Sequence, residues 1–152
     1  MTFRHPKTNQ KLLLRLEDSI HHQNNLGADI IIALDDVVSA TNTDQKRFKE
    51  ATYCTIQKFD RYLASHEKKK IQNVFLTIQG GLDLPLREIC LEAFRDRDHL
   101  IPGYAISGLS GRKEKESFVK IVDFCCNALH DTKPRHLMGV GYPLYYIILC
   151  TA

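Results

Sequence analysis

A carboxylate, a carboxamide and a glycine amide follow three separate apolar runs of the sequence. Asp35 follows the first run, Gln79 the second and Gly108 the third. A carboxylate accepts hydrogen bonds, whereas a carboxamide nitrogen and a backbone N–H donate them. If the fold brings these groups together, they can bind a ligand that presents two donors beside one acceptor.

The lactam edge of guanine has this pattern, because its N1–H and its N2 amino group donate while O6 accepts. Adenine presents a different pattern, and a site built on hydrogen bonds rejects a mismatched ligand by on the order of ten-thousandfold. Such a site explains specificity but not bond cleavage. The alternative is structural: Asp35 and Asp36 could cap the next turn, and the glycines could simply permit tight turns.

β-like runs alternate with helical segments along the chain. The runs cover residues 28–36, 73–81, 103–111 and 135–143. The helical segments cover residues 15–26, 43–66, 85–96 and 113–129. Strand followed by helix, repeated three times, predicts parallel pairing of the strands.

Cap residues stand near the expected helix ends. Thr43 precedes the second helix, Asp83 precedes the third, and Pro85 fits a first helical turn. Gly27 should close the first helix.

Near-continuous apolar strands predict a sheet covered by helices, either a wound α/β sheet or a (β/α) barrel. No Gly-x-Gly-x-x-Gly pattern follows the first strand, which counts against a dinucleotide-binding sheet. In a barrel, the polar groups at the carboxyl ends of the strands converge on one rim. A complete barrel needs about 250 residues and eight strands. We therefore expect an α/β fold, a partial (β/α)8 TIM barrel of about four strand–helix units.

The composition indicates one globular domain. Of the 152 residues, 43% are hydrophobic and 26% are charged, and the net charge of +3 permits an RNA partner without requiring one. The five cysteines show no C-x-x-C spacing, so we expect free thiols. The start of the chain has no signal-peptide pattern and the run YYIILC is too short to span a bilayer, so we expect a cytoplasmic protein without membrane insertion.

Two basic clusters and a histidine pair are secondary candidates. The lysines at 68–70 and the cluster Lys133-Pro134-Arg135 could neutralise phosphates if they lie on the rim, although a solvated helix end explains the lysine run equally well. His21-His22 has no partner at metal-ligand spacing.

Four strings resemble the tRNA-guanine transglycosylase family, in particular its eukaryotic catalytic subunit. They are LGADIIIALDDVVS (26–39), IQGGLDLPLR (78–87), PGYAISGLSG (102–111) and KPRHLMGVGYP (133–143). Their order and approximate spacing also match. The family folds as a (β/α) barrel and exchanges guanine at the tRNA wobble position for queuine through an aspartate nucleophile.

The resemblance implies roles for particular residues. Asp35, Gln79 and Gly108 would recognise the base, and the pocket would be shaped by Val37, Leu109 and Gly111, the last leaving room for the cyclopentenediol of queuine. The segment implied to contact RNA consists of Gly139, Val140, Gly141, Tyr142, Pro143, Leu144 and Tyr145.

The resemblance also implies what this segment lacks. Residues 1–143 match the central part of the barrel, and residues 144–152 diverge. The family's proton-accepting aspartate lies before the matched segment, and its nucleophile and zinc ligands lie after it. We therefore assign no catalytic residue and no metal ligand here, and zinc belongs to the family only. Ser107 stands where glycine is usual, and Arg112 and Lys113 replace a glycine–glutamate pair beside the base pocket.

Three hypotheses follow. The chain belongs to a transglycosylase that acts on tRNA and holds guanine or queuine. Alternatively, it is a non-catalytic half-barrel that binds the base or tRNA and pairs as a homodimer or with a second transglycosylase subunit. The third possibility is a fragment whose open sheet edges prevent stable folding.

Overall fold

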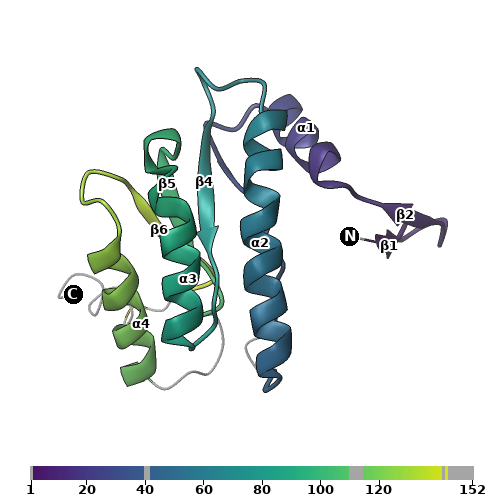
Figure 1. Cartoon of the computed structure of the whole chain (residues 1–152). Coiled ribbons are helices and arrows are strands. Elements are labelled where there is room, and N and C mark those ends of the chain that lie inside the picture. Colours follow the sequence, from purple (N-terminus) through teal and green to yellow (C-terminus); the bar gives the residue numbers. More distant parts are fainter. Residues whose placement is uncertain (1, 40–41, 110–114, 142, 144–152) are drawn as a thin grey trace.

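Four parallel strands form the main sheet in their sequence order, β3-β4-β5-β6 (Figure 1). The computed structural model describes residues 2–39, 42–109, 115–141 and 143. The strands are β3 (Ile30–Ile32), β4 (Asn73–Ile78), β5 (Gly103–Ile106) and β6 (Arg135–Leu137). The connecting helices are α2 (Gln45–Ser65), α3 (Leu84–Arg95) and α4 (Lys115–Ala128). A 3-10 turn, η1 (Asp98–Leu100), precedes β5.

The strand order separates the two α/β folds that the sequence allowed. A doubly wound sheet reverses its strand order and carries helices on both faces. A (β/α) barrel adds its strands in sequence order and keeps its helices outside. Here the order does not reverse, and α2, α3 and α4 lie on one side of the sheet (Figure 1). The expected partial barrel is confirmed.

The helix ends follow the cap residues, with one shift. Asp83 accepts a hydrogen bond from the Leu86 N–H at 3.0 Å at the start of α3, and Gly27 closes α1 (Leu16–Leu26) with φ 76°, both as predicted. The cap of α2 is Asp44 rather than Thr43, because the Asp44 carboxylate accepts from the N–H groups of Lys46 and Arg47.

The hydrophobic core fills the space between the sheet and its helices. Phe59 of α2 and Phe94 of α3 meet edge to face at 5.2 Å between ring centroids, which joins these helices over the sheet. Alternate residues of β4 point into this core, and they are Val74, Leu76 and Ile78. Burial of these apolar side chains stabilises the strand positions from which the polar strand ends extend.

A two-stranded antiparallel hairpin precedes the barrel segment and projects from it (Figure 1). Its strands are β1 (Thr2–Arg4) and β2 (Lys11–Leu13). The turn is held by His5 Nδ1, which accepts from the N–H groups of Lys7 and Thr8. Our sequence analysis did not predict this hairpin, because three-residue strands are too short to show an alternating pattern.

Candidate functional site

Polar side chains gather where β3, β4 and β5 end. Asp35 lies three residues after β3, Gln79 directly follows β4, and Ser107 directly follows β5. Gln79 and Ser107 are buried, while Asp35 is partly exposed. Parallel pairing places the carboxyl ends of these strands at one edge of the sheet, so residues far apart in the sequence become neighbours.

The Asp35 carboxylate is the centre of this group. Its Oδ2 accepts a short hydrogen bond from Gln79 Nε2 and a longer one, at 3.3 Å, from Ser107 Oγ. Oδ1 has no hydrogen-bond partner among the residues that the structure describes. The carboxylate is therefore held in place through one oxygen while the other remains able to accept from a ligand.

Gly108 lies beside the same cluster in a left-handed conformation. Its φ is 78°, and a Cβ on this residue would lie 3.7 Å from Gln79 Oε1. Among the described residues, no acceptor is bonded to the Gly108 N–H. The backbone turn thus leaves a free amide donor near the Asp35–Gln79 pair.

Arg87 of α3 supports the site from behind, and its side chain is fully buried. Its Nε donates to the Gly81 carbonyl at 2.8 Å and its Nη2 donates to the Ser107 carbonyl at 2.7 Å. One guanidinium therefore fixes the loops after β4 and β5 relative to each other. Burial lowers the pKa of this guanidinium, and the neighbouring thiols of Cys125 and Cys90 offset that effect only in part.

The sequence analysis missed Arg87, although one feature of the sequence pointed to it. Position 80 must be glycine for Arg87 to pack here, because a Cβ at Gly80 would lie 2.7 Å from Arg87 Cγ. A glycine pair after a strand, followed by an arginine in the next helix, is thus a signal of close packing as well as of turn formation.

Asp36 has a structural partner instead of a place in the cluster. Its carboxylate forms a two-pronged ion pair with Arg47 of α2, at 2.6 and 3.0 Å, and its N–H donates to Thr55 Oγ1 at 3.1 Å. The hydrogen bonds from Arg47 hold the pKa of Asp36 below its usual value. Asp35 and Asp36, adjacent in sequence, therefore serve different purposes.

Comparison with known proteins gives the context of this cluster. A model of the family described as queuine tRNA-ribosyltransferase matches residues 1–152, which is the whole chain. The chain belongs to the queuine tRNA-ribosyltransferase family. The resemblance read from the four sequence strings is thereby confirmed.

Individual relatives agree with the family match. The chain is 45% identical over 152 residues to the queuine tRNA-ribosyltransferase catalytic subunit of Schizosaccharomyces pombe, covering all of this chain and 37% of that protein. It is 40% identical over 148 residues to the catalytic subunit of Caenorhabditis briggsae, covering 97% of this chain and 36% of the relative. A bacterial queuine tRNA-ribosyltransferase from Fusobacterium nucleatum is 35% identical over 132 residues, or 84% of this chain and 34% of its own length. The chain thus spans little more than a third of these relatives.

The pocket-shaping positions expected from the family lie in different surroundings. Val37 is 70% exposed, at the edge of the cluster. Leu109 is 2% exposed and packs in the hydrophobic core, so it can shape a pocket only through its backbone or by supporting Gly108. Gly111, Arg112 and Lys113 lie outside the described residues.

The expected RNA-contacting segment begins at the end of β6. The Met138 N–H donates to the Ile106 carbonyl at 3.0 Å, which continues the ladder between β5 and β6 past the end of the strand. Gly139 has φ 71°, Val140 is half-buried, and Gly141 is exposed. Pro143 is exposed as well, whereas Tyr142, Leu144 and Tyr145 lie outside the described residues.

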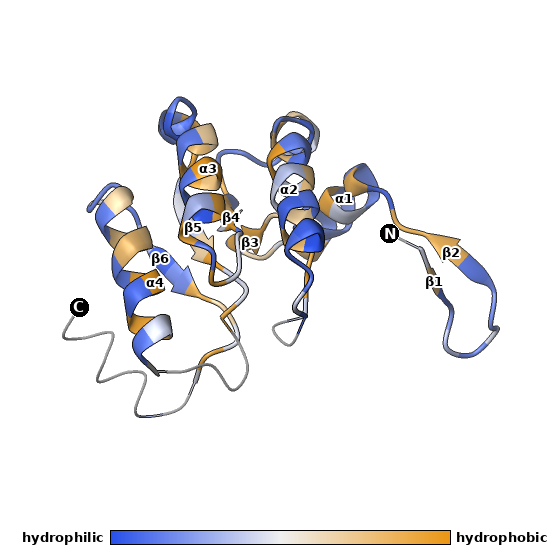
Figure 2. Cartoon of the chain, turned by 60° about the horizontal axis from the view of Figure 1, so that its bottom comes forward, coloured by the Kyte–Doolittle hydropathy of each residue, from blue (hydrophilic) through white to orange (hydrophobic). Residues whose placement is uncertain are grey.

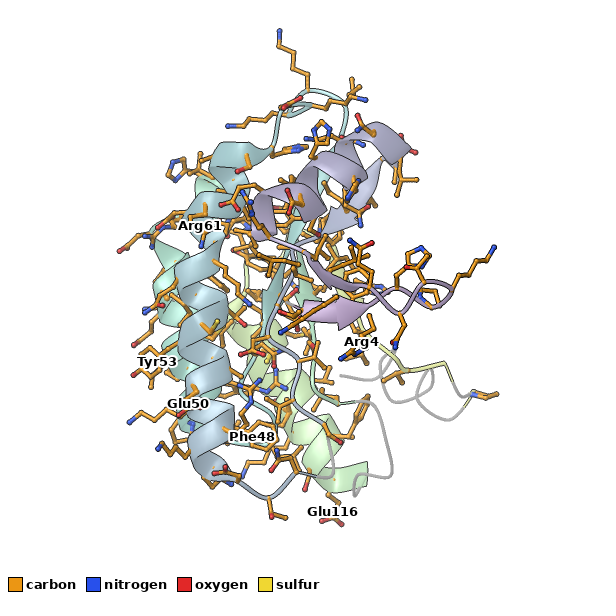
Figure 3. The ribbon with its side chains drawn as sticks, turned by 90° about the vertical axis from the view of Figure 1, so that its right-hand side faces the viewer. Arg4, Phe48, Glu50, Tyr53, Arg61 and Glu116 are labelled. Atoms are coloured by element: carbon orange, nitrogen blue, oxygen red, sulfur yellow. The ribbon has the colours of Figure 1, made fainter. Side chains whose placement is uncertain are left out.

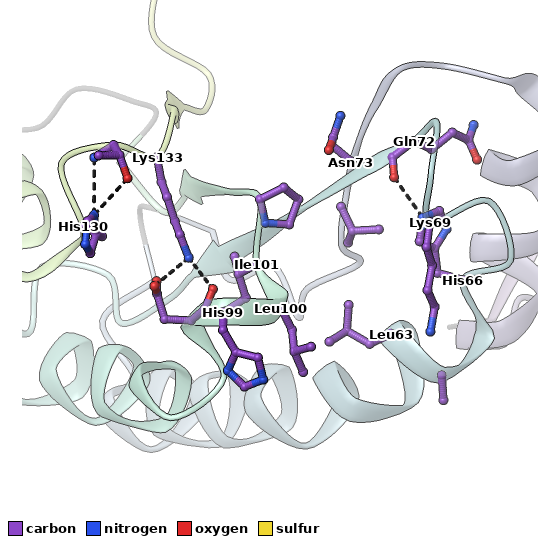
Figure 4. A pocket seen from close by; sticks show the side chains of 15 residues that line it. Leu63, His66, Lys69, Gln72, Asn73, His99, Leu100, Ile101, His130 and Lys133 are labelled. Carbon is purple, nitrogen blue, oxygen red and sulfur yellow. Dashed lines mark hydrogen bonds and ion pairs between the residues drawn. The ribbon is translucent and has the colours of Figure 1, made fainter.

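The two basic clusters lie at the edge opposite the Asp35 cluster. The lysines at 68–70 follow α2 and precede β4, and Lys133 precedes β6, so both clusters stand at the amino ends of strands. The condition for a phosphate-binding role on the rim is therefore not met. A cavity of about 540 Å³ lies at this edge. Lys133 is one of the residues that line it, and its Nζ pairs with Asp98 Oδ2 at 2.6 Å (Figure 4).

Three further features of the described residues concern metal binding, membrane spans and cysteines. Within the described ranges, no three His, Cys, Asp or Glu side chains are grouped so that they could hold a metal ion, so the residues present do not fit the family's zinc. None of the helices in that part of the chain is long and apolar enough to cross a membrane. Cys54, Cys90, Cys125 and Cys126 are free thiols, and burial raises the pKa of Cys90 to about 12.

Proposed function

We propose that this chain supplies the base-recognition part of a tRNA-guanine transglycosylase, which exchanges guanine at the wobble position of tRNA for queuine in the cytoplasm. The observation that carries the proposal is the cluster of Asp35, Gln79 and Gly108 at adjoining strand ends in a chain of this family. The proposal is supported by two relatives, which are named queuine tRNA-ribosyltransferase catalytic subunit.

The hydrogen-bonding groups complement guanine without rearranging the backbone. Asp35 Oδ1 is open and accepts from N1–H or from the N2 amino group. Gln79 Nε2 carries two hydrogens, so it can hold Asp35 with one and donate to O6 with the other. The free Gly108 N–H is a second donor for O6. Adenine brings an acceptor to the carboxylate and an amino group to the donors, so it is excluded.

Queuine rather than a smaller deazaguanine is the expected incoming base. The resemblance places Val37 and Gly111 where bacterial members carry bulkier or polar residues, and Val37 projects into solvent beside the cluster. The nucleophile and the zinc ligands belong to parts of the family barrel beyond the matched segment. No bond-breaking step is therefore assigned to the residues of this chain.

Base binding by the purified chain tests the proposal directly. Calorimetric titration should show that guanine binds, that hypoxanthine, which lacks the 2-amino donor, binds roughly tenfold or more weakly, and that adenine does not bind measurably. Asp35→Asn should abolish the preference for guanine, because the amide brings a donor against N1–H. Asp131→Asn is the matched control, since Asp131 is 97% exposed at the other edge. Equal binding of adenine and guanine would overturn the proposal.

An exchange assay tests where the chemistry lies. The chain is incubated with radiolabelled guanine and unmodified tRNA carrying guanine at the wobble position, with the Schizosaccharomyces pombe relative assayed in parallel. We expect label in the tRNA with the relative and none with the chain alone. Label with the chain alone would contradict the placement of the nucleophile outside this segment.

A further inference from the structure

The projecting hairpin β1–β2 carries an unusual distribution of charge. Residues 1–16 contain four of the 21 Lys and Arg residues of the chain and none of its 18 Asp and Glu residues. The four cations are Arg4, Lys7, Lys11 and Arg15, and all four are exposed. Figure 2 shows the hydrophilic loop of the hairpin extending away from the helices.

The strand register places two of these cations against each other. Arg4 and Lys11 are direct cross-strand partners, so their side chains share one face of the ribbon. Like charges directly opposite each other destabilise a strand pair. Among the described residues, none of the four cations has a carboxylate partner. A bound anion would therefore reduce the repulsion between Arg4 and Lys11.

The hairpin is also poorly stabilised by the rest of the chain. An isolated two-stranded hairpin is marginally stable in water unless it packs on something else. Here the ribbon projects from the body, and Phe3 and Leu13 remain 43% and 63% exposed (Figure 3, in which Arg4 is labelled). Among the residues that the structure describes, the ribbon is thus exposed and accessible to a ligand.

The root of the hairpin lies beside the Asp35 cluster. The carboxyl end of helix α1 leads through Gly27 into the start of β3. The amino end of α1, where the hairpin joins it, therefore lies toward the edge at which the parallel strands end. A cavity of about 540 Å³ is lined by Leu13 and Arg15 on one side and by Asp35 and Val37 on the other. Whatever occupies the base site is thus flanked by the hairpin, whereas the lysines at 68–70 stand at the opposite edge.

We infer that the hairpin β1–β2 is an RNA-binding element, whose Arg4 and Lys11 contact backbone phosphates next to the nucleotide whose base enters the Asp35 cluster. This inference rests on the proposed function, because the cluster defines where the RNA lies. Phosphates suit the ribbon, since Arg and Lys on an extended, acid-free arm match a polyanion that passes along it. Such contacts position the RNA and carry no sequence information.

RNA binding by the full chain tests the inference. The probe is a fluorescein-labelled RNA stem-loop with guanine in its loop, titrated by anisotropy at several salt concentrations. The double variant Arg4→Gln/Lys11→Gln should bind at least tenfold more weakly at about 0.1 M salt, and the slope of log Kd against log salt should fall by about 1.4 to 1.8. The control, Lys69→Gln/Lys70→Gln, removes the same charge at the other edge and should change affinity less than about twofold.

Two further measurements separate the possible failures. The charge-keeping variant Arg4→Lys/Lys11→Arg should retain the wild-type salt slope, which a merely structural role of these side chains would not explain. Guanine affinity should be unchanged in all three variants. Suppose that the wild type binds guanine. The hairpin inference is then overturned, and the proposed function is not, by any of three results: the two neutralised variants lose RNA affinity equally, neither loses any, or the wild type does not bind the RNA. If the wild type fails to bind guanine, the proposed function fails instead.

Discussion

Arg87 Nη2 donates to the carbonyl of Ser107 at 2.7 Å, across the space between helix α3 and the end of strand β5. The same guanidinium reaches Gly81, at the end of β4, through its Nε. Two loops that carry hydrogen-bonding groups of the candidate site are thus held by one side chain that itself lies behind the site. The spacing of Gln79 and Ser107 around Asp35 depends on this support.

Arg87→Met should weaken both stability and base binding. Methionine fills a similar volume but leaves the Gly81 and Ser107 carbonyls without donors in a buried region. The free energy of unfolding should fall by about 3 kcal/mol, because the loss of these hydrogen bonds outweighs the gain from no longer burying a charge. Urea unfolding measures the first effect and guanine titration the second.

The control for Arg87 lies on the same helix. Arg95→Met removes a side chain that is 65% exposed and should change the free energy of unfolding by less than about 0.5 kcal/mol. Arg87→Lys should recover part of the stability but little of the guanine affinity, because one ammonium cannot fix two loops at once. Equal effects of the two methionine variants would contradict the positioning role.

Gly108→Ala should be destabilising through backbone strain rather than through a clash. The nearest atom to an added Cβ is 3.6 Å away, which is an ordinary contact, but φ is 78°. An L-residue in that region costs roughly 1 to 2 kcal/mol. Gly141→Ala is the control, since Gly141 has open space and no positive φ, and it should be nearly neutral. Thermal unfolding of both variants measures this difference, and equal melting temperatures would contradict a backbone strain at position 108.

The Asp36–Arg47 ion pair predicts a pH-dependent contribution to stability. The pKa of Asp36 in the folded chain lies below its ordinary value of 3.8, so the pair contributes fully above that pH and is lost as the pH falls through the lower folded value. Asp36→Asn should cost about 1 kcal/mol at pH 7 and progressively less below pH 4. Asp60→Asn, whose carboxylate is 63% exposed in its pair with Arg97, should cost less. A cost for Asp36→Asn that is independent of pH would argue against the ion pair.

The sequence determined the fold class well because the relevant signals are local and repeated. Apolar runs after Gly27, before Gln79 and before Ser107 became strands, and Asp83 with Pro85 began a helix as expected. The side of the sheet on which a basic cluster falls is not a local property. It depends on where each loop stands relative to the strands, and this is why the sequence left open whether the lysine run lies on the rim.

The sequence predicted which residues form the candidate site, but not which of them contact one another. Asp35 and Gln79 are 44 residues apart, and only the parallel register of β3 and β4 brings them into contact. Arg87 was hidden because an arginine in an amphipathic helix usually reaches solvent, and its burial follows from the close approach that Gly80 allows.

Ser107→Gly should bind guanine more tightly than the wild type. Guanine offers two donors, N1–H and the N2 amino group, and the open Oδ1 of Asp35 can accept from one of them. The Ser107 hydroxyl donates to Oδ2 at 3.3 Å, a long hydrogen bond, and so competes with the second donor for an oxygen that already accepts from Gln79. Its removal should raise guanine affinity about threefold, and hypoxanthine affinity less, because hypoxanthine has one donor fewer to offer the carboxylate. Calorimetry on Ser107→Ala separates two causes of such a gain. An equal gain in guanine affinity for alanine and glycine indicates the loss of the hydroxyl, whereas a gain for glycine alone indicates added space. A loss of guanine affinity in both variants would show instead that the hydroxyl stabilises the carboxylate in its binding orientation.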